Sequence, residues 1–567
     1  MPIPASFPRR LWRLVKPYFS SDQRGRALAF LAAVVALNLI AVYVDVLLNE
    51  FNRDFYNALE QKDYVAFKAQ LLRFSYLAFF FIIVAVYKFY LTQLLELRWR
   101  EWLTRRYIDR WLARRAYYKV ELFHRATDNP DQRIAEDVRA VTEKTVELTM
   151  GLLGSVVTLG AFLSILWAVS GPLSFALGGM QFSIPGYMVW VAVLYAFGGS
   201  WLIHWIGRPL IGINNRQQKV EADFRYGLIR VRENAESIAL YGGEPGERAV
   251  LHNRFGAVLA TTLELIKRQK TVITARVFYA QVAVIFPIVV AAPRYFSGSI
   301  KLGELMQIAS AFGQVQNALS WFIDAYASLA AWKASVDRLL SFDDALLEAE
   351  SGNALSAAPG DAPQMNDVTL TTPQGLPIVT GASLAIAAGE HWLLSGPSGS
   401  GKSTLFRALA GIWPFGKGHI AAPREGVLFL PQRPYLPLGS LKAAVCYPST
   451  PDAISDAAVR AALIDCHLPH LAERLDEDGA WDRQLSPGEQ QRVGFARVLV
   501  NRPRWLFMDE STAALDAPTA RALYALVRLR LPGTTLISIA HNAEIGEFHD
   551  RHIVLTPGPG GSTVEAT

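Results

Sequence analysis

The sequence Gly396-Pro-Ser-Gly-Ser-Gly-Lys-Ser403 decides the fold of the C-terminal half of the chain. It matches the P-loop pattern G-x-x-x-x-G-K-[ST] in full. The apolar stretch 391–395 before it predicts a buried strand, and 403–410 after it predicts a helix. Glycines let backbone N–H groups wrap phosphates at a helix N-terminus, where the helix dipole favours anions. This half is therefore predicted to be an α/β P-loop domain that binds ATP.

Each P-loop position has an expected role. Lys402 is expected to neutralise the β- and γ-phosphates, and the Ser403 hydroxyl is expected to bind Mg²⁺. The residues predicted to bind the nucleotide are Gly396, Pro397, Ser398, Gly399, Ser400, Gly401, Lys402, Ser403 and Thr404.

A second apolar strand, 505–510, ends in two carboxylates. Asp509 suits the Mg²⁺ shell, and Glu510 is placed to polarise the attacking water. Two acids at a strand end can also be merely solvated, but the P-loop in the same half favours the catalytic interpretation.

Two further apolar strands lead into polar residues. The strand 427–430 precedes Gln432, which is expected to contact Mg²⁺ and water, and the strand 534–539 precedes His541, which is expected to contact the γ-phosphate. Either residue alone would be interpreted as an ordinary loop residue.

The segment Leu485-Ser-Pro-Gly-Glu-Gln-Gln-Arg492 lies just before the acidic strand. The order of P-loop, Gln432, this signature, the acidic strand, 511–516 and His541 resembles the ATP-binding cassette of ABC transporters, over about 364–556. The resemblance implies that the signature of one cassette closes over ATP held by the P-loop of another. Ser486 and Gly488 are then phosphate donors, and the chain works as a homodimer.

Two positions depart from that family. Its usual signature is LSGGQ, whereas Pro487 and Glu489 stand here for a glycine and the glutamine. Ser486 and Glu489 keep the spacing of a capping box, and proline is tolerated at the first helical position, so we expect the helix N-terminus to survive. The aromatic residue that often stacks on adenine is replaced around Thr372, so that stacking is weak or supplied elsewhere.

The N-terminal half has the composition of a membrane domain. The 567 residues exceed one core, and 51% of them are hydrophobic against 19% charged. A membrane-spanning helix needs about 20 apolar residues. About six stretches qualify, the last two being interrupted by proline or polar residues: 27–48, 71–95, 149–170, 186–206, 273–293 and 305–330. Polar residues in such a span face a bundle interior or a wet cavity.

Charge predicts the orientation. Lys and Arg are dense before the first stretch and after the second and fourth, and sparse in the alternate loops. By the positive-inside rule both termini and the nucleotide-binding domain are cytoplasmic. The net charge of +6 is thereby explained by topology, and no nucleic-acid partner is needed. Two cysteines, Cys446 and Cys466, indicate no disulfide framework.

The predicted organisation has four parts. Residues 1–26 are a cytoplasmic N-terminus whose stretch 7–19 reads as an amphipathic helix on the inner leaflet. Residues 27–340 form an all-α transmembrane domain, 341–365 form a linker rich in Ala, Gly, Ser and Pro, and 366–567 form the cassette. Spans two to five are expected to continue as helices well beyond the bilayer.

Motifs in both halves narrow the resemblance. The segments 129–137, 233–241, 405–414 and 430–435 are similar to the SbmA/BacA-like, or YddA-type, ABC transporters and to the related subfamily D half-transporters. That resemblance implies an exporter-type ABC fold, and short coupling helices in 129–139 and 233–244. Composition alone would make both segments solvated helix faces.

The resemblance also suggests the cargo. SbmA/BacA-like relatives are associated with peptides and other bulky hydrophilic molecules, including cobalamin, and subfamily D relatives with acyl-CoA. Polar residues of the last span and two more in other spans favour a wet cavity and a peptide-like cargo: Gln307, Gln314, Gln316, Asn317, Asp324, His204 and Lys88. Trp321, Phe322 and the aromatic cluster 79–81 are expected equally to face lipid or to serve in packing.

The leading hypothesis is an ATPase that drives transport of such solutes across a bacterial inner membrane, with ATP and Mg²⁺ as cofactors. A fatty-acyl or lipid-precursor exporter, and an ATP-gated adaptor that transports little, stay open. The direction of transport also stays open.

Overall fold

The structure is a computed structural model, and it describes residues 7–123, 129–177, 180–351, 355, 357–540 and 543–566. The chain divides into two units. We call Met1–Asp109 with Asn129–Asp343 the membrane unit, and Arg110–Asp128 with Asp344–Thr567 the cassette unit.

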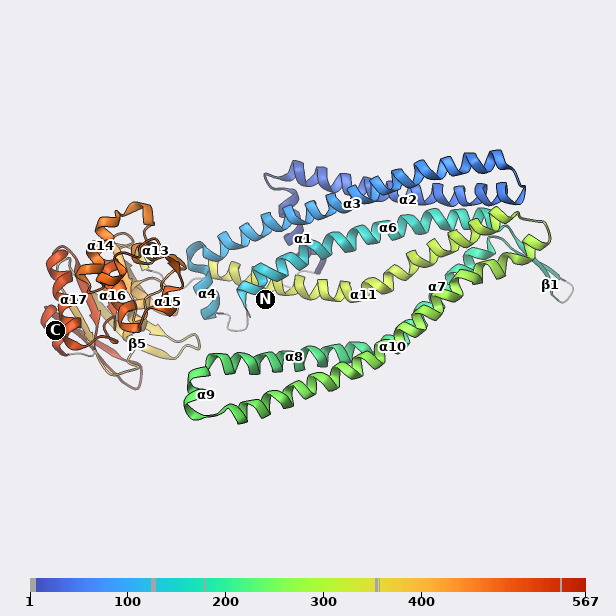
Figure 1. The fold of residues 1–567 in the computed structure, drawn as a ribbon. Coiled ribbons are helices and arrows are strands. Elements are labelled where there is room, and N and C mark those ends of the chain that lie inside the picture. The colour runs from blue at the N-terminus through green and yellow to red at the C-terminus, as the bar shows by residue number, and fades with distance from the viewer. Residues whose placement is uncertain are drawn as a thin grey trace. The chain divides into compact units, whose positions relative to one another are not determined.

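Long helices make up most of the membrane unit (Figure 1). They are α1 (Phe7–Phe19), α2 (Arg24–Glu60), α3 (Tyr64–Leu112), α6 (Val138–Ser170), α7 (Tyr187–Gly207), α8 (Pro209–Glu233), α9 (Ala235–Tyr241), α10 (Glu244–Phe296) and α11 (Leu302–Ser351). Shorter elements are α5 (Pro130–Gln132), η2 (Arg133–Asp137) and the hairpin of β1 (Leu173–Leu177) and β2 (Met180–Ile184). The all-α prediction holds for this half apart from that hairpin.

Five helical segments are long and apolar enough to cross a membrane: Arg24–Glu60, Tyr64–Leu122, Pro130–Ser170, Tyr187–Glu233 and Glu244–Phe296. They contain the first five predicted spans. The sixth, 305–330, is one continuous helix within α11 but does not reach the same apolar threshold over its described residues. Its glutamines and asparagine are the reason. The predicted extension of helices beyond the bilayer is confirmed by the lengths of α3 and α10.

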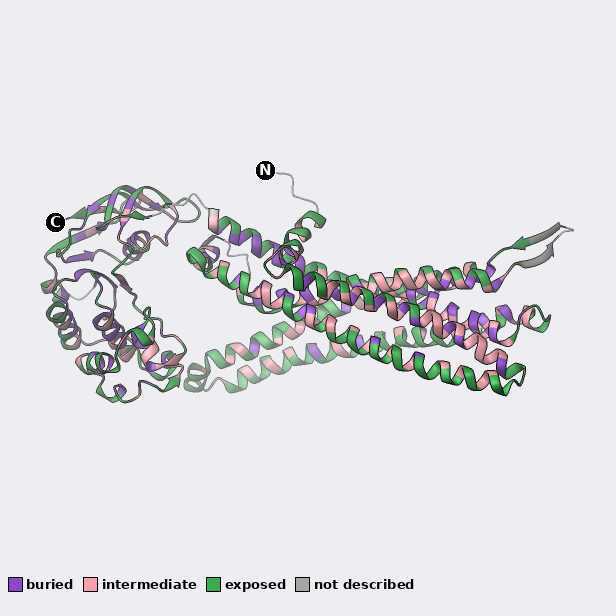
Figure 2. Cartoon of the chain, turned by 90° about the horizontal axis from the view of Figure 1, so that it is seen from above, coloured by how far each residue is buried: buried purple, intermediate pink, exposed green. Residues whose placement is uncertain are grey.

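The membrane unit has a core of its own among α6, α7, α10 and α11. Phe162 and Phe312 are fully buried there, and Tyr195 stacks on Tyr279 with ring centroids 4.7 Å apart. In Figure 2 buried residues recur along the long helices among intermediate and exposed ones, and the exposed residues include many large apolar side chains. Exposed apolar faces of this kind suit helices surrounded by lipid.

Two buried amides of the membrane unit, on α2 and α11, form hydrogen bonds with each other. Gln307 Nε2 donates to Asn49 Oδ1 at 3.1 Å, and Asn49 Nδ2 donates to the Gln307 carbonyl at 3.2 Å. Buried amides need such partners because hydrocarbon offers none. This pair holds α2 against α11.

An amphipathic helix forms at the N-terminus as predicted. In α1, Leu14 and Tyr18 are buried, and Tyr18 lies stacked near Trp99 of α3 with centroids 6.0 Å apart. Arg13 pairs with Asp343 of α11 at 3.6 Å. The helix is therefore held against the membrane unit by its own packing, and its placement on the inner leaflet stays a prediction.

A helical hairpin is formed by α8 and α10, which run side by side, with α9 at its tip (Figure 1). Gly242 ends α9 in the left-handed conformation, φ 63°, that a helix C-terminus favours for glycine. Leu240 and Tyr241 at this tip are 79% and 88% exposed.

The cassette unit has the predicted α/β fold, built on two main sheets. The six-stranded sheet has the order β14-β13-β6-β12-β11-β8, in which β13, β6, β12, β11 and β8 are parallel. The second sheet has the order β3-β7-β4-β5. The strands are β3 (Ala357–Pro359), β4 (Gln364–Thr371), β5 (Pro377–Ala385), β6 (Trp392–Ser395), β7 (Gly416–Ala422), β8 (Val427–Leu430), β11 (Trp505–Asp509), β12 (Thr535–Ile539), β13 (Arg551–Thr556) and β14 (Thr563–Ala566).

Helices of the cassette unit flank these sheets, and a two-stranded pair of β9 (Gly439–Ser440) and β10 (Asp478–Gly479) lies apart from them. The helical elements are η1 (Ala113–Arg115), α4 (Ala116–Phe123), α12 (Lys402–Leu409), α13 (Leu441–Cys446), η3 (Pro451–Ala453), α14 (Asp456–Asp465), η4 (Pro469–Leu471), α15 (Trp481–Gln484), α16 (Pro487–Asn501), α17 (Ala517–Arg530) and η5 (Ala543–Phe548).

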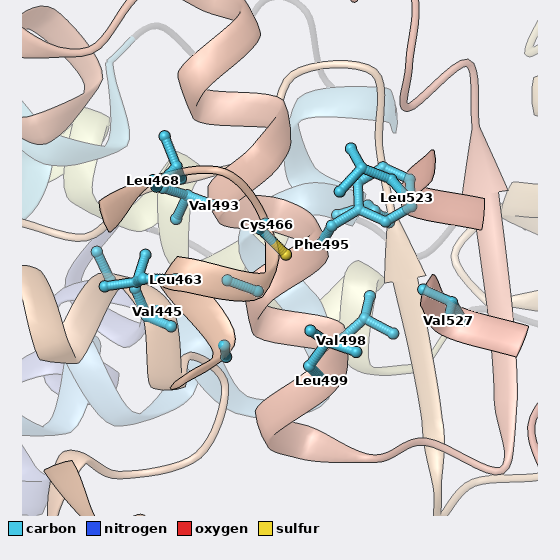
Figure 3. Packing of buried hydrophobic residues seen from close by; sticks show 14 of the residues in the cluster. Val445, Leu463, Cys466, Leu468, Val493, Phe495, Val498, Leu499, Leu523 and Val527 are labelled. Carbon is cyan, nitrogen blue, oxygen red and sulfur yellow. The ribbon is translucent and has the colours of Figure 1, made fainter. Parts of the chain in front are cut away.

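The largest apolar core of the cassette surrounds α16. Figure 3 shows Val493 and Phe495 of α16 among side chains of α13, α14 and α17. Burial raises the pKa of the Cys466 thiol in this core to about 12, so Cys466 is a packing residue here. This core fixes the helix whose N-terminus carries the signature.

The segment predicted as a linker, 341–365, is more regular than its composition suggests. Residues 341–351 continue α11, and the segment also contains β3 and the start of β4. Asp343 and Asp344 mark the division between the two units. The part that continues α11 contains alanine, leucine and glutamate, which have high helix propensity, whereas the glycines and prolines of the segment come after Ser351.

A buried ion-pair cluster gives a test of the membrane unit. Arg338 Nε and Arg133 Nη1 donate to Asp137 Oδ2 at 3.0 and 2.5 Å, and Asp137 is 3% exposed. We expect Asp137→Ala to destabilise the unit by about 3–5 kcal/mol, because breaking a buried pair leaves an uncompensated charge. Thermal unfolding in nanodiscs should then show an apparent Tm lower by about 5 °C or more.

The matched control is Glu143→Ala, which removes an exposed pair of Glu143 with Arg139. Its apparent Tm should stay unchanged within error. Equal shifts in the two variants would contradict the assignment of Asp137 as a stabilising centre.

Candidate functional site

The P-loop joins the end of β6 to the start of α12. Residues 396–401 form the loop, and Lys402, Ser403 and Thr404 form the first helical turn. Gly401 has φ 96°, and a Cβ there would lie 2.8 Å from the Ile378 side chain. Glycine is required at this position because both the conformation and the space exclude a side chain.

The charge and donors inside this loop fit a phosphate. Lys402 is 7% exposed, and its Nζ donates to the carbonyls of Gly396 at 2.7 Å and Pro397 at 2.9 Å. The Ser400 hydroxyl is buried and has no hydrogen-bond partner within the described residues. A buried orphan hydroxyl beside an ammonium and a helix N-terminus is a suitable site for a phosphate oxygen.

Two side chains suited to a magnesium ion meet across the sheet. Ser403 Oγ donates to Asp509 Oδ1 at 3.1 Å, although Asp509 comes from β11 and Ser403 from α12. Burial raises the pKa of the Asp509 carboxyl, Glu510 adds to this, and the Ser403 hydroxyl, Arg407 and Lys402 oppose it. Hard oxygen donors of this kind suit Mg²⁺, so we propose that Ser403 and Asp509 hold it.

Glu510 lies beside Asp509 with an unusual backbone. Its φ is 48°, a left-handed conformation that costs a non-glycine residue about 1–3 kcal/mol. Its N–H donates to the Ile539 carbonyl at 3.0 Å, which fixes the turn. Gln432 Nε2 donates to Glu510 Oε2 at 3.2 Å. We propose that Glu510 polarises the attacking water and that Gln432 orients it.

The structure thus brings together Ser403, Gln432 and the adjacent pair Asp509 and Glu510 from three separate segments. The predicted His541 lies outside the described residues, so its contact with the γ-phosphate stays a prediction.

The signature forms the predicted helix N-terminus. Ser486 caps α16, its hydroxyl accepts from the Glu489 N–H, and the Glu489 side chain accepts from the Ser486 N–H, which together make the expected capping box. Pro487 occupies the first turn. At Gly488 an added Cβ would lie 3.2 Å from the Ala514 carbonyl. Pro487 and Glu489 therefore leave the helix N-terminus intact.

Gln491 was not among the predicted site residues, yet it connects two of the functional loops. Its Nε2 donates to the Gln432 carbonyl at 3.0 Å, and its Oε1 accepts from the Ala514 N–H at 2.9 Å. It is 4% exposed. Its place inside the segment 485–492, three or four residues from Gly488, Gly494 and Phe495 on the same face of α16, was the available signal. We propose that it holds the Gln432 loop and the segment 511–516 in register.

A cavity of about 640 Å³ in the membrane unit is the candidate cargo site. Its wall mixes polar groups, two charges and aromatic rings, among them Asn38, Lys88, Glu147, Gln314, Asn317 and Trp321. Three of the predicted polar residues, Lys88, Gln314 and Asn317, are thus brought together. Any side chain at Gly151 would meet the Trp321 indole, at 2.7 Å from its nitrogen.

The remaining predicted cargo residues lie elsewhere. Gln307 bonds to Asn49, Asp324 pairs with Arg276 at 3.4 Å, and His204 is exposed on α7. The side chain of Phe322 lies outside the described residues.

The segment 110–128 belongs to the cassette unit, and its described part packs within it. Arg115 donates to the Ala410 carbonyl at the end of α12, and Leu122 of α4 packs against the cassette core. Residues 129–139 belong to the membrane unit, where they lead into α6. Their role as a coupling helix stays a prediction.

Comparison with known proteins agrees with this geometry. Residues 14–296 match the family described as ABC transporter transmembrane region 2, and residues 379–513 match the ABC transporter family. Over 539 residues the chain is 35% identical to the inner membrane ABC transporter ATP-binding protein YddA of Escherichia coli K12, covering 95% of each chain. The chain belongs to the ABC transporter family. Its cassette is accordingly an ATPase domain coupled to transport, as predicted.

More distant relatives agree with the suspected group. The chain is 33% identical to the chloroplastic ABC transporter D family member 2 of Arabidopsis thaliana, covering 96% of this chain and 85% of the relative. It is 28% identical to the human lysosomal cobalamin transporter, covering 97% and 95%. The fold is similar to a bacterial Atm1-family ABC exporter with ATP bound, with a TM-score of 0.71, 19% identity and coverage of 95% and 94%. The exporter-type fold is confirmed.

A substitution at Glu510 tests its proposed role. We expect Glu510→Gln to retain ATP binding and to lower steady-state hydrolysis by about 100-fold or more, because the amide cannot accept the proton of the attacking water. Phosphate release in nanodiscs measures the rate, and retained nucleotide measures binding. Undiminished hydrolysis would remove Glu510 from this role.

Proposed function

We propose that this ABC half-transporter works as a homodimer that moves peptides or similarly bulky hydrophilic solutes across a bacterial inner membrane. Both termini and the cassettes face the cytoplasm in this proposal. The Lys and Arg bias of the loops supports that orientation, and the inner-membrane relative supports the location. Mg²⁺ bound through Ser403 and Asp509 accompanies ATP.

The observation that carries the cargo class is the lining of the membrane cavity. Amides and hydroxyls from α2, α3, α6 and α11 alternate with Phe81, Phe89 and Trp321 around it. A peptide presents backbone amides together with apolar side chains, and this lining complements both. Lys88 and Glu147 supply one charge of each sign.

The same lining argues against other cargoes. Acyl-CoA carries several phosphate charges and would require more than one cation, whereas Lys88 is the single cation in the described cavity wall. A lipid precursor would favour an apolar wall, whereas Asn38, Gln314 and Asn317 place amide groups in this one. A cobalamin-like solute is amide-rich and fits the proposal, in line with the name of the lysosomal relative.

The homodimer is supported by surfaces that the single chain leaves uncovered. Ser486 at the signature is exposed, so its donors can meet a nucleotide from another copy. Leu240 and Tyr241 at the tip of α9 are also exposed. Apolar side chains at such a tip are suited to docking on a cassette, which is the role predicted for 233–244.

Mixed dimers test whether the ATP site is shared between two copies. A Lys402→Ala copy and a Ser486→Ala copy each lack one half of the site. If sites form between copies, their mixed dimer has one site with both defects and one intact site. We expect vanadate-trapped nucleotide at about half the wild-type level in mixed dimers purified through two affinity tags.

The control pairs a wild-type copy with a copy that carries both substitutions. Both shared sites are then defective, so trapping should fall to background. If this control traps nucleotide at half the wild-type level and the first mixture traps none, each site is built within one chain and the homodimer proposal is wrong.

Solute-stimulated hydrolysis tests the cargo. We expect a cationic peptide to raise ATPase activity in nanodiscs at least about twofold, and acyl-CoA to leave it unchanged. Lys88→Gln should raise the peptide concentration for half-maximal stimulation about fivefold, whereas Lys301→Gln, outside the cavity, should not change it. Stimulation by acyl-CoA alone would favour the lipid reading, and no stimulation by peptide, cobalamin or acyl-CoA would favour an adaptor.

A further inference from the structure

The signature carries a charged side chain where the ATP-binding surface needs hydrogen-bond donors. Glu489 Oε2 accepts from the Ser486 N–H at 3.0 Å and from the Ser486 hydroxyl at 2.8 Å. These bonds hold the pKa of the Glu489 carboxyl below its usual value, so it is ionised at neutral pH. The hydroxyl hydrogen of Ser486 is therefore directed toward Glu489.

This arrangement places the carboxylate in competition with a phosphate. The N-terminus of the 15-residue helix α16 carries a partial positive charge that favours an anion. The Glu489 carboxylate already uses part of that charge and two of the donors. A γ-phosphate that approaches Ser486 must accept the hydrogen bond that the hydroxyl now donates to Glu489. The phosphate is also repelled by the negative charge of that carboxylate.

A histidine from another element holds the second oxygen of this carboxylate. His470, in η4, has its Nε2 3.1 Å from Glu489 Oε1. An ionised carboxylate has no hydrogen to give, so His470 Nε2 carries the hydrogen and donates it. This bond draws negative charge toward Oε1 and away from the oxygen that faces Ser486.

We propose that Glu489 and His470 are positioning residues of the signature that control how readily Ser486 binds the γ-phosphate. The proposal rests on the site shared between two copies. Glu489 orients the Ser486 hydroxyl and caps the helix, and its charge weakens phosphate binding. His470 anchors the carboxylate and reduces that effect. When the site closes over ATP, the Ser486 hydroxyl gives up its hydrogen bond to Glu489 and donates to the γ-phosphate instead.

Steady-state hydrolysis by the full chain in nanodiscs separates this role from a purely structural one. Glu489→Gln keeps an oxygen that can accept from the Ser486 N–H and removes the charge. We expect its KM for ATP to fall about fivefold while kcat stays within about twofold, since a neighbouring exposed charge contributes up to about a fivefold effect. Loss of the helix cap alone would instead lower stability and kcat.

The histidine is tested through the glutamate. We expect His470→Ala to raise KM about threefold, and His470→Gln, which keeps a donor, to restore it to within about twofold. In the Glu489→Gln background, His470→Ala should leave KM unchanged, because its effect acts through the carboxylate. Glu473→Gln is the matched control, because Glu473 is an exposed glutamate that pairs with Arg460 and lies just after η4.

Two results would overturn the proposal: a higher KM in Glu489→Gln, or an equal effect of His470→Ala in both backgrounds. Apparent Tm identifies any variant whose KM changes only because the variant is unstable. If His470→Ala is unstable, the conservative variants Glu489→Gln and His470→Gln decide the outcome. The mixed-dimer experiment distinguishes failure of this proposal from failure of the shared site. If the shared site holds and these KM changes are absent, only the positioning role is wrong.

Discussion

The parallel pairing of β6, β12, β11 and β8 is the constraint on which the ATP site depends. Parallel strands end at the same edge of a sheet, so the segments that follow them must converge there. The P-loop follows β6, the acidic pair ends β11, and Gln432 follows β8. Residues more than 100 positions apart, such as Ser403 and Asp509, can therefore form a hydrogen bond of 3.1 Å.

The signature helix depends on a different support. The N-terminus of α16 is useful for phosphate only if the helix is held rigidly, and the apolar core around Val493, Phe495 and Val498 provides this. Gln491 on the same helix binds the Gln432 loop and the segment after Glu510. A movement of α16 would therefore displace the loops that carry the residues proposed for water activation. By this connection, closure over ATP would act on Glu510, the carboxylate proposed to activate water.

The membrane unit obeys another rule, because hydrocarbon cannot satisfy backbone or side-chain polar groups. Its chain is accordingly helical almost throughout, and Asn49 and Gln307 form hydrogen bonds with each other. Polar residues such as Lys88 and Asn317 lie at the cavity. The sixth segment thus has two roles: Gln307 holds α11 against α2, and Gln314 and Asn317 line the cavity that is the candidate cargo site. Its weaker hydropathy follows from both.

Local sequence was sufficient wherever the physics is local. The local signals each act over a few residues: the glycine spacing of the P-loop, the capping box of Ser486 and Glu489, the apolar strands and the length of the spans. The sequence could therefore predict the α/β cassette, the helical membrane half and most of the candidate site residues. Contacts between distant segments could not be. The bonds of Gln491, the left-handed Glu510, the pairing of His470 with Glu489 and the contact of Arg115 with Ala410 arise from packing. Such pairings depend on the folded path of the chain, which composition and spacing do not contain.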